Sequence, residues 1–238
     1  MINLAKRSEQ LELIDTESPG YDEWCIILNE LELINKLTFA YSPTIKVIDR
    51  TLKARHEGQQ RPVKVLDVGF GYGDVLRRLA RRAVKKKYSF DLTGFEINPW
   101  AVKVAREVTP AEMKIRYLTS NIFEENLKES YDIIINSLFT HHLKSEEIIK
   151  LVQWMCCHAK YGWVINDLHR HRIPYYFIKY FTRFLRFNRC IINDAPLSVA
   201  RSFVRSDWES IIKNANIDFS NVSISWHWPF RYCVSYMG

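Results

Sequence analysis

Hydrophobic positions along this chain follow two spacings in alternation, and these predict strands that alternate with helices. Short apolar runs bounded by turn-forming residues predict buried strands, and they lie at residues 63–68, 89–96, 115–118, 131–136 and 162–168. Segments with apolar residues three or four positions apart predict helices, and they lie at residues 22–37, 42–55, 75–80, 99–106 and 145–158. Strands that alternate with helices pair in parallel, so the pattern predicts a doubly wound α/β sheet.

The last part of the chain has a different pattern. Residues 168–205 form an insertion, in which the aromatic-rich stretch 175–187 predicts a helix; a single helical stripe of it carries Lys179, Thr182, Arg183 and Arg186. The residues Ser206-Asp207-Trp208-Glu209 predict, as a capping box, the start of a final helix. Apolar residues then recur at every second position over 222–228 and 232–236, which predicts a C-terminal antiparallel hairpin.

Together these elements predict a seven-stranded, mostly parallel, Rossmann-like sheet with an antiparallel C-terminal hairpin. We expect residues 1–60 to form an N-terminal helical cap and residues 61–238 to form the core. The insertion at residues 168–205 is expected to lie over the substrate crevice. Residues 58–62 are polar and contain Gly and Pro, so they predict a linker between the cap and the first strand.

A glycine-rich turn follows the first strand directly. Asp67 ends an apolar run, three glycines follow at alternate positions (Gly69, Gly71 and Gly73), and an apolar helix begins just after them. Glycines let a ligand approach the backbone, and a helix N-terminus adds unpaired N–H groups, so the turn predicts a nucleotide-type ligand site. Two departures count against a dinucleotide: the third glycine comes one residue early, and the next acid, Glu96, lies beyond the usual gap of about 20 residues.

The ordered set of acids and glycines instead resembles class I S-adenosylmethionine-dependent methyltransferases. The resemblance rests on Asp67-x-Gly69-x-Gly71-x-Gly73, followed by Gly94-Phe95-Glu96-Ile97. It implies S-adenosylmethionine as cofactor and S-adenosylhomocysteine as product. It also implies a cofactor site, with Asp67, Gly69, Phe70 and Gly71 at the methionine end, Glu96 and Ile97 at the ribose, Asn121 and Ile122 at the adenine, and the main chain near Asn136. An acid is frequent in the family where Asn121 stands, and a simple turn asparagine is the alternative interpretation.

Later motifs resemble a bacterial methyltransferase subgroup of polyketide and phenolic-lipid pathways. They lie at residues 13–15, 137–143, 166–170 and 194–203. The resemblance implies a small aromatic or phenolic acceptor that is methylated on oxygen. Methylation of a ring carbon is the nearest alternative, and a non-catalytic cofactor-binding module is another. A nucleic-acid methyltransferase is disfavoured because many carry Asn/Asp-Pro-Pro-aromatic after the fourth strand, where this chain reads Asn136-Ser137-Leu138-Phe139.

Acceptor chemistry is expected at the carboxyl end of the fourth strand, where open α/β sheets bind ligands. A phenol benefits from a base that removes its proton, and histidine is suited to that task near neutral pH. His142 is the first catalytic candidate, and His141 is expected to point elsewhere. Asp167 and His169 are second candidates, and hydrogen bonding that only holds the loop together is the alternative interpretation. Adjacent histidines do not readily chelate one ion, so no metal is predicted.

Composition and charge add only general limits. The 238 residues are 47% hydrophobic, enough for one α/β domain, and no apolar run approaches the roughly 18 residues of a membrane span. The N-terminus lacks a signal-peptide apolar region, so we expect a cytoplasmic protein. Five cysteines without metal-ligand spacing predict reduced thiols, with neither a disulfide nor structural zinc.

The formal net charge of +7 does not select a partner. Basic residues at 77–87 are interpreted as a solvated outer face. The basic stripe at 175–187 suits peripheral contact with the anionic inner face of a membrane. The competing interpretation of that helix is a lid, or a dimer helix whose aromatic side chains pack on the protein itself.

Overall fold

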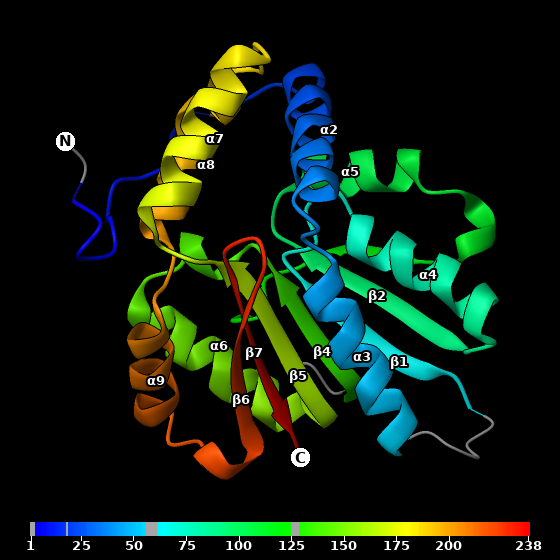
Figure 1. The fold of residues 1–238 in the computed structure, drawn as a ribbon. Helices are drawn as coiled ribbons and strands as arrows, with labels where there is room; N and C mark the ends of the chain where they lie inside the picture. Colours follow the sequence, from blue (N-terminus) through cyan, green and yellow to red (C-terminus); the bar gives the residue numbers. More distant parts are fainter. Residues whose placement is uncertain (1–2, 18, 56–60, 125–128) are drawn as a thin grey trace.

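A seven-stranded sheet forms the centre of the computed structural model, which describes residues 3–17, 19–55, 61–124 and 129–238 (Figure 1). The predicted linker at residues 58–62 begins outside these ranges. The strand order is β3-β2-β1-β4-β5-β7-β6, and β7 runs in the opposite direction to the other strands of the sheet. The strands are β1 (Val63–Val68), β2 (Phe90–Glu96), β3 (Arg116–Thr119), β4 (Tyr131–Ser137), β5 (Ala159–Leu168), β6 (Val222–His227) and β7 (Arg231–Met237). The predicted fold is confirmed.

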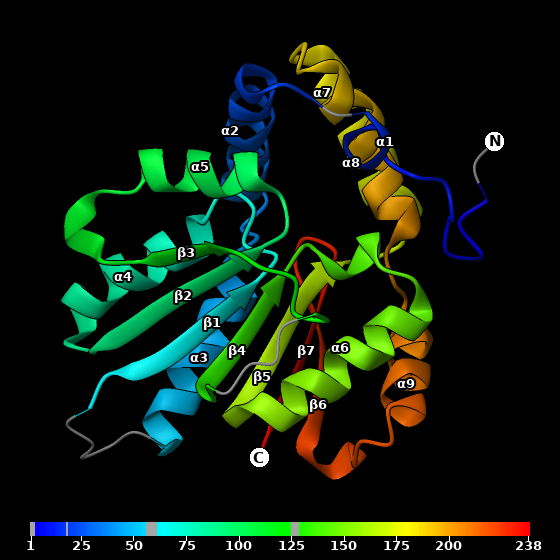
Figure 2. The ribbon, with the colours of Figure 1, turned by 180° about the vertical axis from the view of Figure 1, so that it is seen from behind.

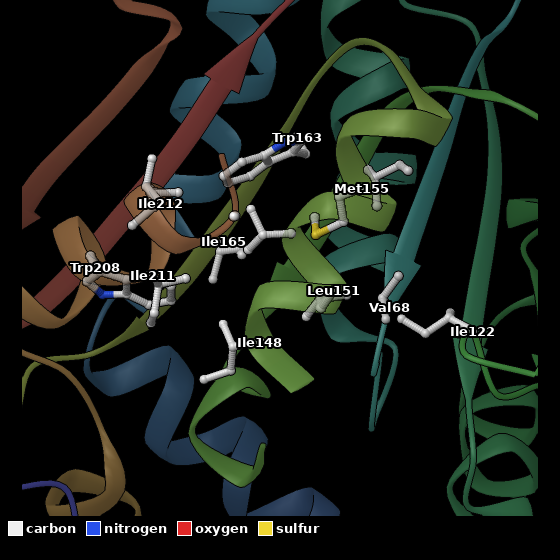
Figure 3. Packing of buried hydrophobic residues seen from close by; sticks show 14 of the residues in the cluster. Val68, Ile122, Ile148, Leu151, Met155, Trp163, Ile165, Trp208, Ile211 and Ile212 are labelled. Atoms are coloured by element: carbon white, nitrogen blue, oxygen red, sulfur yellow. The ribbon is translucent and has the colours of Figure 1, made fainter. Parts of the chain in front are cut away.

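Helices cover both faces of the sheet, which is why its central strands are apolar on both sides. One face packs against α3 (Ser42–Arg55), α4 (Asp74–Lys86) and α5 (Pro99–Val108). The other face, seen from behind in Figure 2, packs against α6 (Ser145–His158) and α9 (Arg205–Asn214). Figure 3 shows Leu151 and Met155 of α6 packing beside Ile165 of β5. The described residues also include four short helices: α1 (Leu13–Thr16), η1 (Ala111–Met113), η2 (Thr140–His142) and η3 (Phe219–Asn221).

A separate helical cap stands beyond the carboxyl ends of the strands. It consists of α1, α2 (Tyr21–Leu37), α7 (Arg172–Phe184) and α8 (Arg189–Arg201), and Figure 1 shows α2 opposite α7 and α8 above the sheet. Apolar side chains of α2, α7 and α8, among them Ile27, Ile178 and Ile191, share one cluster. The N-terminal segment and the insertion therefore build a single cap, whereas α3 packs on the sheet.

Several local expectations for the insertion need correction. The aromatic helix ends at Phe184, and Arg186 lies beyond it with a φ of +54°. Thr182, which belongs to the predicted stripe, is fully buried. On the helix itself, the basic residues of the stripe are therefore Lys179 and Arg183 alone. The helix α8 was not predicted, because its mixed polar and apolar sequence and its internal Pro196 conceal a helical period. Within the described residues, no helix has both the length and the apolar character needed to cross a membrane.

Two further expectations are wrong for identifiable reasons. The final helix begins at Arg205, and its first turn is capped by Asp207, whose carboxylate accepts a hydrogen bond from the Val204 backbone N–H at 2.8 Å. Ser206 is therefore not the N-cap. Arg77, grouped with the solvated basic face, is 3% exposed and lies 3.6 Å from the Glu32 carboxylate. Arg77 can be buried because the Glu32 carboxylate, on another helix, compensates its charge.

Two buried arginines connect the cap to the core. Arg170 lies after β5 and forms an ion pair with Asp207 of α9 at 2.8 Å. Arg201 ends α8 and donates hydrogen bonds to the backbone carbonyls of His141 at 3.0 Å and His142 at 2.8 Å. Because these contacts join segments far apart in the sequence, both arginines hold the insertion against the sheet.

Candidate active site

A cavity of about 480 Å³ lies between the cap and the carboxyl ends of β1, β4 and β5. Its walls come from the glycine turn, α2, the loop after β4, α7, α8 and the turn before β7. The lining is mainly apolar and carries a few polar groups, as is usual for small-molecule sites. The polar groups that bear on chemistry are Glu12, Asp74, Ser137, His141, His142 and Arg231.

The glycine turn forms one wall of this cavity. Gly69 and Gly71 have φ angles of +70° and +52°, a region in which a side chain is strained. A Cβ at Gly69 would lie 2.6 Å from the Phe139 ring, whereas a Cβ at Gly71 would meet no atom within 4 Å. Gly71 is therefore fixed by its backbone conformation, and the space in front of it is open to a ligand.

Two buried acceptors without donors lie below the turn. Both carboxylate oxygens of Asp67, at the end of β1, and Oδ1 of Asn136, at the end of β4, have no hydrogen-bond partner. Burial, followed by the charges of Asp74 and Glu96, raises the pKa of Asp67 well above its ordinary value. Unpaired buried acceptors are costly, and a ligand that carries N–H donors would satisfy them.

Glu96 and Ile97 follow β2 next to the turn. The Glu96 carboxylate accepts hydrogen bonds from the backbone N–H of Gly71 at 3.1 Å and of Ile97 at 2.8 Å. Burial raises the pKa of Glu96. Glu96 does not line the cavity, but it is hydrogen-bonded to Gly71, which does.

Asn121 and Ile122 follow β3, outside the cavity wall. The Asn121 amide donates to Glu124 at 2.8 Å and accepts a hydrogen bond from the Phe123 backbone N–H at 3.1 Å. These are the contacts of a turn asparagine, so the alternative interpretation of Asn121 describes its state in this structure. Ile122 is 6% exposed and packs in the core below.

His141 and Asp167 form a buried pair at the edge of the cavity. His141 Nδ1 lies 2.8 Å from Asp167 Oδ1, and the second carboxylate oxygen accepts hydrogen bonds from Thr140 Oγ1 and from the His141 backbone N–H. Although burial raises the pKa of Asp167, the charge and hydrogen bond of His141 bring it to about 2. In the neutral form of His141, an ionised Asp167 favours the tautomer with the proton on Nδ1, which leaves Nε2 as the acceptor.

His142 also lines the cavity but has a different environment. Its Nδ1 lies 3.3 Å from Asp15 and 3.8 Å from Glu12. Burial disfavours the charged form, yet the hydrogen bond with Asp15 and the charges of Glu12 and Asp15 raise the pKa of His142 to about 9. His142 is therefore protonated at neutral pH, and a protonated histidine does not act as a base.

The positions of the two histidines differ from the sequence expectation in one respect. His141 was expected to point away from the crevice, but the 3-10 turn η2 places both rings on the cavity, with centroids 4.4 Å apart. Glu12, His141 and His142 also bring one ligand atom each within 4.8 Å of one another. This spacing is compatible with a metal ion, and the absence of a metal stays a prediction.

His169 lies behind the cavity wall, among aromatic residues. Its Nδ1 accepts a hydrogen bond from Trp226 Nε1 at 3.2 Å, and its ring packs against Phe230 and Tyr232. Burial, aided by the charges of His171 and Arg170, lowers the pKa of His169 to about 4. The structure does not bring His169 together with His141 and His142.

Sequence reasoning missed three residues of the site region. The sequence does not place His141 at the site, because in an extended loop its side chain would point away from the crevice. Arg231 begins an alternating strand and is not among the predicted site residues. Its position next to apolar residues is nevertheless a signal that the sequence offers. Asp194 accepts hydrogen bonds from the backbone N–H groups of Leu13 at 2.8 Å and Ile14 at 3.0 Å, which joins α8 to α1 beside the cavity. No local sequence signal could have paired those segments.

Comparison with known proteins places the glycine turn within a recognised domain. Residues 65–162 match a family model described as a methyltransferase domain. This stretch runs from β1 into β5 and leaves out the cap. Over 117 residues, or 48% of this chain, the sequence is 29% identical to a putative protein N5-glutamine methyltransferase of Methanocaldococcus jannaschii. The match spans 56% of the length of that relative.

Solved structures resemble almost the whole chain. The plantazolicin methyltransferase BpumL, in complex with S-adenosylhomocysteine, has a TM-score of 0.65 at 13% identity, covering 95% of this chain and 93% of its own. Magnesium protoporphyrin IX methyltransferase from Synechocystis has a TM-score of 0.58 at 14% identity, covering 97% and 99%. Human N-acetylserotonin methyltransferase has a TM-score of 0.66 at 12% identity, covering 95% and 59%. At these identities the likeness shows the fold.

Proposed function

We propose that this chain, whose residues 65–162 match a methyltransferase domain, uses S-adenosylmethionine to methylate a hydroxyl group on a small aromatic acceptor. The observation that carries this proposal is the position of the His141–Asp167 pair. It lies on the same cavity as the glycine turn, so a base faces the space next to the cofactor site.

The residues at the strand ends fit S-adenosylmethionine. The unpaired oxygens of Asp67 and Asn136 suit the amino group of its methionine part, and the open space at Gly71 admits the chain of that part. The Glu96 carboxylate suits the ribose hydroxyls, and Ile97, Asn121 and Ile122 remain the residues proposed for the ribose and adenine. When bound, the cofactor supplies a methyl group on a positively charged sulfur.

The chain itself would orient the acceptor and remove its proton. His141 Nε2 takes the hydroxyl proton as the oxygen accepts the methyl group, and Asp167 holds the ring and stabilises its charged form. Asp167 does not line the cavity, so it is a positioning residue. The cap helices α2, α7 and α8 line the cavity, and an acceptor held against them would have a fixed arrangement relative to the base.

Other acceptors remain as alternatives that the same assay can detect. The Methanocaldococcus relative suggests an amide nitrogen, but a planar amide has little need of a histidine base in the ground state. A ring carbon next to a phenol hydroxyl would use the same base and is the second candidate. Nucleic acid, or binding of the cofactor without any turnover, would leave the His141–Asp167 pair without a catalytic task.

Product analysis with methyl-labelled S-adenosylmethionine tests the proposal. A panel of phenols, catechols and an RNA sample is incubated with the protein, and the labelled products are identified by mass spectrometry. We expect oxygen-methylated phenols. Glu96→Ala serves as the control: we expect it to weaken S-adenosylhomocysteine binding by about 1–3 kcal/mol, because it leaves buried partners unpaired, and to lower labelling accordingly. Exclusive labelling of RNA, or labelling of none of the samples, would overturn the proposed activity.

A further inference from the structure

Arg231 is a buried cation in the cavity wall. It is the first residue of β7, where it pairs with Leu168 of β5 and His227 of β6, and it is 2% exposed. The cavity wall includes it beside Leu168 and Phe230. Arg231 therefore lies at the carboxyl end of β5, where a ligand held in the cavity can reach it.

Most of its hydrogen-bonding capacity is unused. Nη2 donates to Thr38 Oγ1 at 2.9 Å, whereas Nε and Nη1 are buried without a partner. Burial lowers the pKa of Arg231 to about 10, so the side chain still carries its charge at neutral pH. Asp167 acts on Arg231 through its charge, but the Asp167 oxygens are already bonded to Thr140 and His141.

Two other buried arginines, Arg170 and Arg201, have more hydrogen-bond partners than Arg231. Arg201 uses Nε, Nη1 and Nη2, donating to the carbonyls of His141, Gln10 and His142. Arg170 is bonded to Asp207 and to two carbonyl oxygens. An unpaired buried charge is costly unless it gains a partner. Arg231 therefore has the properties of a binding site for an anion.

We propose that Arg231 binds a carboxylate of the acceptor, which makes the acceptor an aromatic hydroxy acid. A guanidinium presents paired N–H donors that match the two oxygens of a carboxylate. This inference rests on the proposed function, because it assigns the second polar group of the same acceptor: the hydroxyl lies at His141 and the carboxylate lies at Arg231. Both residues line the same cavity.

The cofactor also carries a carboxylate, but its predicted site lies elsewhere on the sheet. The methionine part, which bears that carboxylate, is predicted at the glycine turn after β1 and near Asn136 of β4, whereas Arg231 starts β7, on the far side of β5. The acceptor half of the cavity is therefore the half that contains Arg231.

The test compares matched acceptors that differ in one group. Hydroxybenzoates and the corresponding hydroxybenzamides are assayed with the wild-type protein and with Arg231→Gln and Arg231→Lys. We expect the wild type to prefer the acids. With Arg231→Gln, we expect the KM for the acids to rise ~10–100-fold, as for a lost hydrogen bond to a charged group, while the KM for the amides changes less than about threefold and the affinity for S-adenosylhomocysteine is unchanged.

Two outcomes would overturn the assignment. Equal use of acids and amides by the wild type would show that no carboxylate is recognised, and this comparison needs no variant. Reduced affinity for S-adenosylhomocysteine in a folded Arg231→Gln protein would assign the anion to the cofactor instead. Arg231→Lys keeps the charge and is expected to retain part of the preference for acids. Failure of the wild type to methylate any phenol, acidic or neutral, would instead refute the proposed function.

Discussion

At the scale of single residues, two adjacent histidines differ because their carboxylate partners differ. His141 Nδ1 faces Asp167, which is buried and also accepts hydrogen bonds from Thr140 and from the backbone N–H groups of His141 and Leu168. His142 faces Asp15 and Glu12, and their charges raise its pKa to about 9. A protonated histidine cannot accept a proton, so the environment of His142 favours ion pairing, and the proposed base is His141.

We predict that His141→Asn lowers kcat by about 10²–10⁴, the usual contribution of a general base. The affinity for S-adenosylhomocysteine is expected to stay unchanged, and the rise of kcat with pH that reports the base should disappear. The measurement is the pH profile of kcat with a phenol acceptor. His142→Asn is the matched control and is expected to keep that rise. A profile that survives in His141→Asn and vanishes in His142→Asn would return the role to His142.

At the scale of elements, α7 uses its two faces for different purposes. Tyr175, Ile178 and Thr182 are buried against the rest of the cap. Phe177 is 55% exposed and lines the cavity, whereas Phe184 is 84% exposed and lies at the helix end, away from the cavity wall. The aromatic residues of this helix are therefore not equivalent, although the sequence pattern treats them alike.

We predict that Phe177→Ala raises the KM for acceptors with a long alkyl tail by about 3–10-fold, as expected for the loss of part of an apolar contact. Acceptors without a tail should change less than about twofold. Steady-state kinetics on a series of phenols with increasing tail length measures this effect. Phe184→Ala is the control, with the same chemical change outside the cavity wall, and a tail-length effect of equal size in both variants would contradict the prediction.

Contact of α7 with an anionic membrane remains a prediction at the same scale. The exposed surface of α7 is more aromatic than basic, since Phe177, Tyr180 and Phe184 are exposed and Arg186 lies outside the helix. The helix therefore has fewer basic side chains for attraction to anionic lipid than the sequence predicts. Its exposed aromatic side chains, which could enter the membrane interface, remain.

At the scale of the whole molecule, the N-terminal segment joins the cap to the sheet. Arg7 donates hydrogen bonds to the carbonyls of Arg201 at 2.8 Å and Leu143 at 3.1 Å, and Ser198 bonds Glu12 at 2.9 Å. The pair His142–Asp15 adds a charged contact between this segment and the loop after β4. Stability of the cap should therefore depend on the charge of His142.

We predict that Asp15→Asn destabilises the protein by roughly 2 kcal/mol near pH 6, and that the difference shrinks as the pH approaches 10. The pKa of His142 is raised from 6.5 to about 9 in the folded state. Its stabilising contribution is therefore complete below about pH 6.5 and is lost as the pH rises through about 9. Urea unfolding of both proteins across this range measures the difference, and a gap that does not change with pH would contradict the coupling.

The sequence by itself determined the sheet and the glycine turn at its carboxyl edge. Apolar runs such as 63–68 and 131–136 are buried on both faces wherever a parallel sheet places them. The glycine turn is equally local, because positive φ angles at Gly69 and Gly71 are decided by the absence of a Cβ. Such features depend on neighbours in the chain, so a pattern can report them.

Only the tertiary structure decided which polar side chains meet at the cavity. Asp167 selects His141 across 26 positions of sequence, and Thr38 meets Arg231 across 193. Helix α8 and the N-terminal segment find each other through Asp194, without any local signal. The physical reason is that burial and charge act through space: the pKa of a histidine, or the lack of a partner for an arginine, depends on groups brought near by the fold and not on the adjacent residues.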